Sequence, residues 1–153
     1  MSLDEARLRA AMPRILGYWR EWMRGAPDSA PRARERGRCE QAFVAAVICA
    51  ALAGRDDSAA RCALEAAAHE YGALPRSKPL DPSELCDELG MLRHAIWRCV
   101  CEQHGDDSER LNFVAALDYT ISLAVQATLR GGYGRELDRR RVTSMSSGEH
   151  ARR

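Results

Sequence analysis

Apolar residues recur at three- and four-residue spacings along most of this chain. The segment 42–53 is apolar on nearly all sides, which is typical of a helix at the centre of a domain. The regular spacing indicates helices whose apolar faces meet in one core. One such apolar stripe consists of Leu85, Leu89, Leu92, Ile96 and Cys99. The complete pattern predicts five principal helices, near residues 2–24, 32–53, 57–71, 82–103 and 108–130.

Capping residues indicate where several of these helices begin. Asp81 is suited to cap a helix whose first residue is Pro82, with Glu84 completing the cap. Asp57 or Ser58 is expected to cap the helix near 57–71 in the same way.

Two further signals concern helix interruption. Pro13 predicts either a kink in the first helix or a second helix that starts there with proline in its first turn. Gly131, Gly132 and Gly134 predict that the last principal helix ends near residue 130. We therefore expect a helical domain over 1–131. Residues 132–153 are then a polar, Arg-rich tail with at most a short helix near 135–141.

The composition supports one globular, helical domain. The chain has 153 residues, enough to bury a core without disulfide or metal staples. Its dominant residues are Ala, Leu, Arg and Glu, which favour helix, whereas β-branched and aromatic residues are sparse. The predicted fold is an all-α bundle of five to six helices, either upright or with globin-like crossings.

Charge and hydropathy indicate which partners and which cellular compartment to expect. A net charge of +1 and acidic residues interleaved with the arginines of 32–38 and 135–141 give no reason to expect nucleic acid as a partner. The longest apolar run, 42–53, is shorter than the roughly 20 residues of a membrane span. The charged N-terminus does not resemble a signal peptide, so we expect a cytoplasmic protein with reduced cysteines.

The helix near 82–103 has a second face that is poor in charge. Gly90, His94, Trp97, Cys101 and His104 lie there, roughly opposite the leucine stripe. Three interpretations remain open: the helix is central and packed on both sides, the face binds a partner or a second subunit, or it lines a ligand pocket. Gly90 would let another backbone approach closely. These five residues are the candidate interface.

Catalytic and metal-binding interpretations find less support. Cys101, His104, His94 and His69 lack the second tightly spaced pair that a metal site requires, so we expect neither metal nor haem. No nucleophile lies on a turn that would present it to a substrate, and we expect no catalytic site and no cofactor. The acids Glu84, Asp87 and Glu88, at the start of a helix, are interpreted as offsetting its dipole.

Several segments together resemble one known family, the RsbRD-type N-terminal sensor domain found ahead of sensor histidine kinases and stressosome-like co-antagonists. The segments are RILGYW (14–19), HEYG (69–72), LDPSEL (80–85), ELGMLRHAI (88–96) and residues 113–125. The resemblance implies a helical bacterial sensor domain. Because no kinase core follows Arg130, it implies a stand-alone module that passes its signal to another polypeptide.

Two functions follow as hypotheses. The first is a non-enzymatic helical signalling module that binds a regulatory protein, such as a histidine kinase or a component of a sigma-factor pathway, and forms a homodimer. The second is a small-molecule or cofactor-binding sensor that uses the second face of the helix near 82–103.

Overall fold

The computed structural model describes residues 5–23, 30–76, 78–103 and 106–150; for residues 30–32 and 142–150 only the backbone is considered. This part of the chain contains helices and no strand, which confirms the all-α prediction. The helices are α1 (Glu5–Ala10), α2 (Met12–Trp22), α3 (Ala30–Ala53), α4 (Ser58–Gly72), α5 (Pro82–Cys101) and α6 (Asp107–His150).

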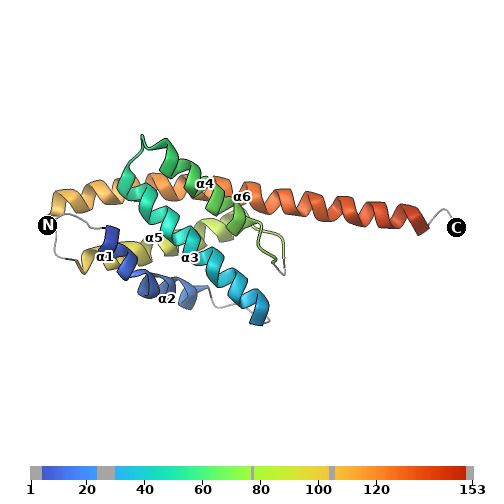
Figure 1. Ribbon diagram of the computed structural model, residues 1–153, viewed down its shortest axis with the longest axis horizontal. Coiled ribbons are helices and arrows are strands. Elements are labelled where there is room, and N and C mark those ends of the chain that lie inside the picture. Colours follow the sequence, from blue (N-terminus) through green and yellow to red (C-terminus); the bar gives the residue numbers. More distant parts are fainter. Residues whose placement is uncertain (1–4, 24–29, 77, 104–105, 151–153) are drawn as a thin grey trace.

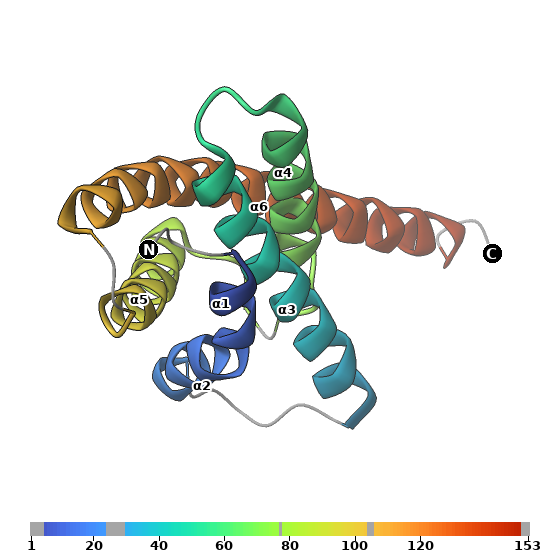
Figure 2. The same ribbon diagram turned by 60° about the vertical axis from the view of Figure 1, so that its left-hand side comes forward.

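The helices pack around one apolar core. α3 and α4 lie side by side, α4 crosses the middle of α6, and α5 packs between α2 and the first half of α6 (Figures 1 and 2). The predicted leucine stripe of α5 is fully buried, as are Phe43, Val44, Val47 and Ile48 in the apolar run at the end of α3. No helix in the described part of the chain has the length and apolar character that a membrane span requires.

The predicted helix starts agree closely with the structure. The carboxylate of Asp81 accepts hydrogen bonds from the backbone N–H groups of Ser83 and Glu84, at 2.8 and 3.0 Å. Asp57, rather than Ser58, caps α4, by accepting from the N–H of Ala60 at 2.9 Å. The Glu84 side chain pairs with Lys78.

Pro13 marks a second helix rather than a kink. The chain turns at Ala11 between α1 and α2, and Pro13 lies in the first turn of α2. Proline is tolerated there because its missing N–H would have no partner inside the helix.

The predicted end of the last helix near residue 130 is wrong. α6 continues through Gly131, Gly132 and Gly134 to His150, so the expected tail is largely helical. A Cβ at Gly131 would overlap the backbone carbonyl of His69, and a Cβ at Gly72 would overlap that of Thr128. These glycines are therefore needed where α4 and α6 cross with their backbones in contact. A glycine inside a helix costs only about 1 kcal/mol relative to alanine, which the buried crossing offsets.

We expect Gly131→Ala to destabilise the protein by about 2 kcal/mol or more, because the added methyl must push α4 and α6 apart. Gly134→Ala is the matched control on the same helix. Its Cβ would meet nothing within 4 Å, so alanine should raise stability by about 0.5–1 kcal/mol. Urea unfolding followed by circular dichroism measures both changes. Equal effects of the two substitutions would contradict the close crossing.

Candidate functional site

The candidate interface predicted from the sequence lies on an uncovered side of α5. Gly90, His94 and Cys101 are exposed, and nothing comes within 4 Å of a Cβ built on Gly90. Trp97 is half-buried and packs against the core. His104 lies outside the described residues. Among the residues that the structure describes, none covers most of this face, so α5 is not packed on both sides there.

A buried polar cluster, which the sequence analysis missed, links four parts of the fold. The hydroxyl of Tyr71 donates a hydrogen bond to the carboxylate of Glu88. The indole N–H of Trp19 donates to the backbone carbonyl of the same glutamate at 2.9 Å. Arg76 completes the cluster, with Nη1 3.9 Å from Glu88 Oε2 and its guanidinium carbon 5.3 Å from the centre of the Tyr71 ring. One glutamate, through its carboxylate and its backbone carbonyl, therefore connects α2, α4, α5 and the α4–α5 connection.

An aromatic stack and a second ion pair extend this cluster. The rings of Phe43 and Tyr71 are nearly parallel at 4.9 Å, and Trp19 lies 5.6 Å from Tyr71. Arg20 Nε contacts Glu40 Oε2 at 2.6 Å, and the Glu40 side chain is only 5% exposed. Buried carboxylates are expensive unless paired, so these partners explain how two glutamates are accommodated in the interior.

Glu88 therefore has a different role from the one predicted. Its side chain is 15% exposed and turned toward the interior, rather than simply offsetting the dipole of α5. A signal was present in the sequence: Glu88 is three residues after Leu85 and next to Leu89, on the apolar side of the helix. Glu40 likewise precedes Phe43 and Val44 by three and four residues.

The Tyr71 hydroxyl is not suited to proton transfer near neutral pH. Burial raises the pKa of Tyr71 well above 10.0, and the neighbouring charge of Glu88 raises it further. The phenol therefore remains protonated and acts as a hydrogen-bond donor. The cluster is a structural link between helices.

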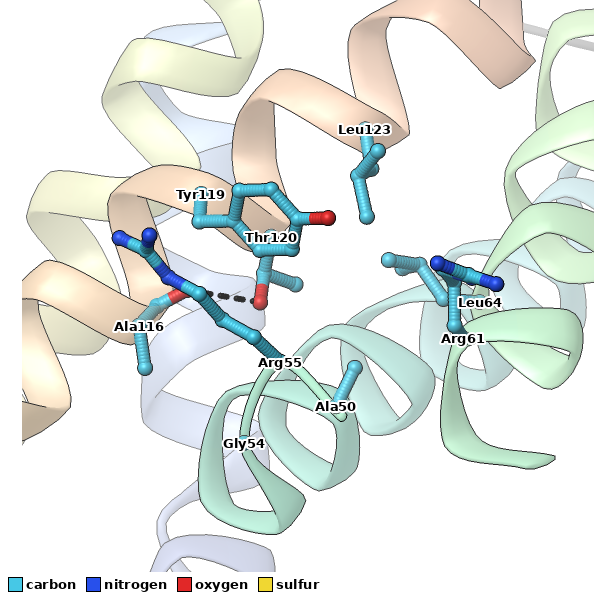
Figure 3. A pocket seen from close by; sticks show the side chains of 9 residues that line it. All are labelled: Ala50, Gly54, Arg55, Arg61, Leu64, Ala116, Tyr119, Thr120 and Leu123. Carbon is cyan, nitrogen blue, oxygen red and sulfur yellow. Dashed lines mark hydrogen bonds between the residues drawn. The ribbon is translucent and has the colours of Figure 1, made fainter. Parts of the chain in front are cut away.

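A small pocket lies between the α3–α4 turn and α6 (Figure 3). Its volume is about 10 Å³, room for about one water molecule. Arg55 lies over the ring of Tyr119, with 4.8 Å from its guanidinium carbon to the ring centre. The hydroxyl of Thr120 is bonded to the carbonyl of Ala116, shown as the dashed line. An organic ligand does not fit this space.

A much larger groove separates α1 and α2 from the first half of α3. Its volume is about 840 Å³, and it is open to solvent. Four arginines dominate its lining. The lining residues are Arg9, Met12, Pro13, Leu16, Arg20, Arg34, Gly37, Arg38 and Gln41. Neither this groove nor the small pocket is lined by a residue of the candidate interface.

The structure brings together no metal-binding set among the residues that it describes. No group of three or more His, Cys, Asp or Glu side chains there is arranged to hold an ion. All six cysteines are free thiols, and Cys99 is buried in the core.

Comparisons with known proteins add no assignment. No protein-family model, no curated protein and no solved structure matches the chain. The resemblance to the RsbRD-type sensor domain therefore stays a prediction from the sequence.

The raised pKa of Tyr71 gives the protein an alkaline stability limit. The stability from its protonated hydroxyl is fully present below pH 10.0 and is lost as pH rises from there toward the higher pKa in the folded state. The unfolded chain loses this proton first. Tyr71→Phe should lower stability by about 1–3 kcal/mol at pH 8, because Glu88 loses its buried donor. That deficit should shrink above pH 10.

Urea unfolding of the parent and Tyr71→Phe between pH 8 and 11 measures this difference. Tyr133→Phe, at an exposed tyrosine of α6, is the control and should keep the parent's pH profile. If the stability difference between the parent and Tyr71→Phe stays constant across this pH range, the role given to the Tyr71 hydroxyl is wrong.

Gly90→Leu tests the candidate interface without disturbing the fold. Because nothing lies within 4 Å of a Cβ at Gly90, we expect the variant to unfold at a temperature equal to or above that of the parent. Lower association of the variant in sedimentation velocity would identify this face as a subunit contact. A drop in melting temperature would instead show that the face is covered by the chain itself.

Proposed function

We propose that this protein is a non-enzymatic helical signalling module that self-associates and binds a regulatory protein partner. The observation that supports it most directly is the second half of α6. This segment continues as a helix beyond the bundle (Figure 1). The proposal that it works in the bacterial cytoplasm rests on the sequence alone.

The projecting part of α6 lacks the packing that normally stabilises a helix. Near the start of this projection, a Cβ at Gly132 would meet Leu80, and Arg135 donates a hydrogen bond to the carbonyl of Ala73. From 133 to 141 every side chain except Glu136 is exposed. An isolated helix of about 15 residues is marginal in water, so a partner helix would add stability.

A short apolar strip on this projection supplies the contact surface. Tyr133 is 49% exposed and Leu137 is 59% exposed. They are four residues apart and therefore neighbours on one face, continuing from the half-buried Leu129. A second copy of the chain offers the same strip, and a twofold pairing of the two chains buries both strips at once.

The crossing of α4 and α6 supports a role in transmission. Because their backbones touch at Gly72 and Gly131, the direction of the projection depends on the position of α4. A partner bound to the bundle can therefore influence how two projections pair. The open face of α5 around Gly90, His94 and Trp97 is a second surface for such a partner.

The alternative, a small-molecule sensor using that face of α5, has less support. Neither of the two pockets described above reaches it. An absorption spectrum and metal analysis of the purified protein would detect a bound chromophore or ion and so favour this alternative.

Leu137→Glu tests the proposed self-association. Burying most of a leucine contributes about 1.5–3 kcal/mol, and a twofold dimer contains two of them, so dimer dissociation should increase more than tenfold. Glutamate favours helix, so α6 should persist. Sedimentation velocity over a range of concentrations measures the effect.

Leu111→Glu is the matched control, because Leu111 is 69% exposed at the opposite end of α6. It should leave association unchanged. A parent protein that is monomeric at all concentrations, or a Leu137→Glu variant that associates like the parent, would show that self-association through the projection is wrong.

A further inference from the structure

The arginine-lined groove is the largest hollow described above, and its lining points to a particular kind of ligand. One wall is the first half of α3, which carries Arg34 and Arg38; the other is α1 and α2, which carry Arg9 and Arg20. Met12, Pro13 and Leu16 of α2 contribute the apolar part of the lining, with Pro13 the most exposed of the three. Figure 2 shows α2 and the first half of α3 diverging from each other.

The two arginines of α3 are available for a ligand. Arg34 and Arg38 are exposed and make no ion pair with any residue in the described ranges. They are four residues apart, so both project from the same side of α3. Guanidinium groups bind carboxylates in a planar, two-pronged geometry, which makes unpaired arginines strong recognition groups for anions.

The arginines of the other wall are each paired with an acid, so the net positive charge of the groove comes from Arg34 and Arg38. Arg9 pairs with Glu5 at 2.7 Å, where both side chains are about half exposed. Arg20 reaches across to Glu40 on α3, whose carboxylate is buried. The outer surface of the groove therefore presents four guanidinium groups above two acids, one of them buried.

The spacing favours an extended ligand over a compact anion. Arg9 and Arg20 come from two successive helices and reach α3 at different points, Cys49 and Glu40, so the arginines are spread along the groove. A phosphate or citrate ion would need the guanidinium groups gathered around one point. A helix with an apolar row beside a row of carboxylates instead matches apolar residues of α2 that lie beside the arginines of α3.

We propose that this groove binds an acidic amphipathic helix of a partner protein. The inference rests on the proposed function, since it specifies the chemistry of the regulatory partner. The apolar row of that helix lies over Met12, Pro13 and Leu16, and its carboxylates pair with the exposed guanidinium groups of Arg34 and Arg38.

The test uses the full-length protein and a synthetic probe. The probe is a fluorescein-labelled peptide of about 18 residues, five helical turns, with leucines on one face and glutamates beside them. A second peptide has the same composition, shuffled so that the leucines share no face. Fluorescence anisotropy gives the affinities, and amide chemical-shift changes locate the bound peptide.

We expect the amphipathic peptide to bind, with shift changes concentrated on residues 9–20 and 34–41. The double variant Arg34→Glu/Arg38→Glu should weaken binding by about tenfold or more, because two attractive contacts become repulsive. The matched control, Arg61→Glu/Arg130→Glu, alters the net charge equally at exposed arginines outside the groove. The affinity of this control variant for the peptide should stay within about twofold of the parent's. Higher salt should weaken peptide binding to both proteins.

Three results would overturn the inference. The first is that the amphipathic peptide does not bind, or that it causes chemical-shift changes outside the groove. The second is that the shuffled peptide binds equally well, and the third is that both double variants lose the same amount of peptide affinity. Sedimentation of the same proteins separates this outcome from a failure of self-association. Arg34→Glu/Arg38→Glu should associate like the parent, because α3 and the projecting half of α6 lie apart. A failed peptide test with intact association rejects the groove ligand alone.

Discussion

The backbone contact between α4 and α6 is the constraint on which the rest of the structure depends. Gly72 lies against the carbonyl of Thr128, and Gly131 lies against that of His69, so any side chain at either glycine would separate the helices. This contact fixes the line along which α6 leaves the bundle. The projecting half of α6 is therefore an extension of a rigid crossing, and its direction is set by the packing of α4.

The buried polar cluster holds the remaining helices to that crossing. Tyr71, one residue before Gly72, stacks on Phe43 of α3, donates to Glu88 of α5 and lies beside Trp19 of α2. A single residue at the end of α4 thus contacts three other helices directly. Such a cluster specifies one arrangement of helices, because displacement of any member leaves a buried polar group without its partner.

These links give the proposed function a physical basis. Arg20 lines the arginine-rich groove and pairs with Glu40, which lies one turn from Phe43 in the aromatic stack. The groove, the cluster, the α4–α6 crossing and the projection are therefore joined by a continuous series of packed side chains. A ligand changes the balance between two arrangements only by the difference in its affinity for them. In the proposed module, one arrangement is the protein with a free projecting half of α6, and the other is the dimer in which two such projections pair.

The sequence by itself determined the helical class, most helix positions and the core face of α5. These follow from local chemistry: the Leu85–Cys99 stripe is periodic, and Asp57 and Asp81 cap their own helices. Tertiary structure decided the roles of Gly131 and Glu88. A glycine can end a helix or permit a close crossing, and a glutamate beside an apolar stripe can face water or a buried donor. The outcome depends on which residue lies opposite, and His69 and Tyr71 are remote in sequence from the groups that they contact.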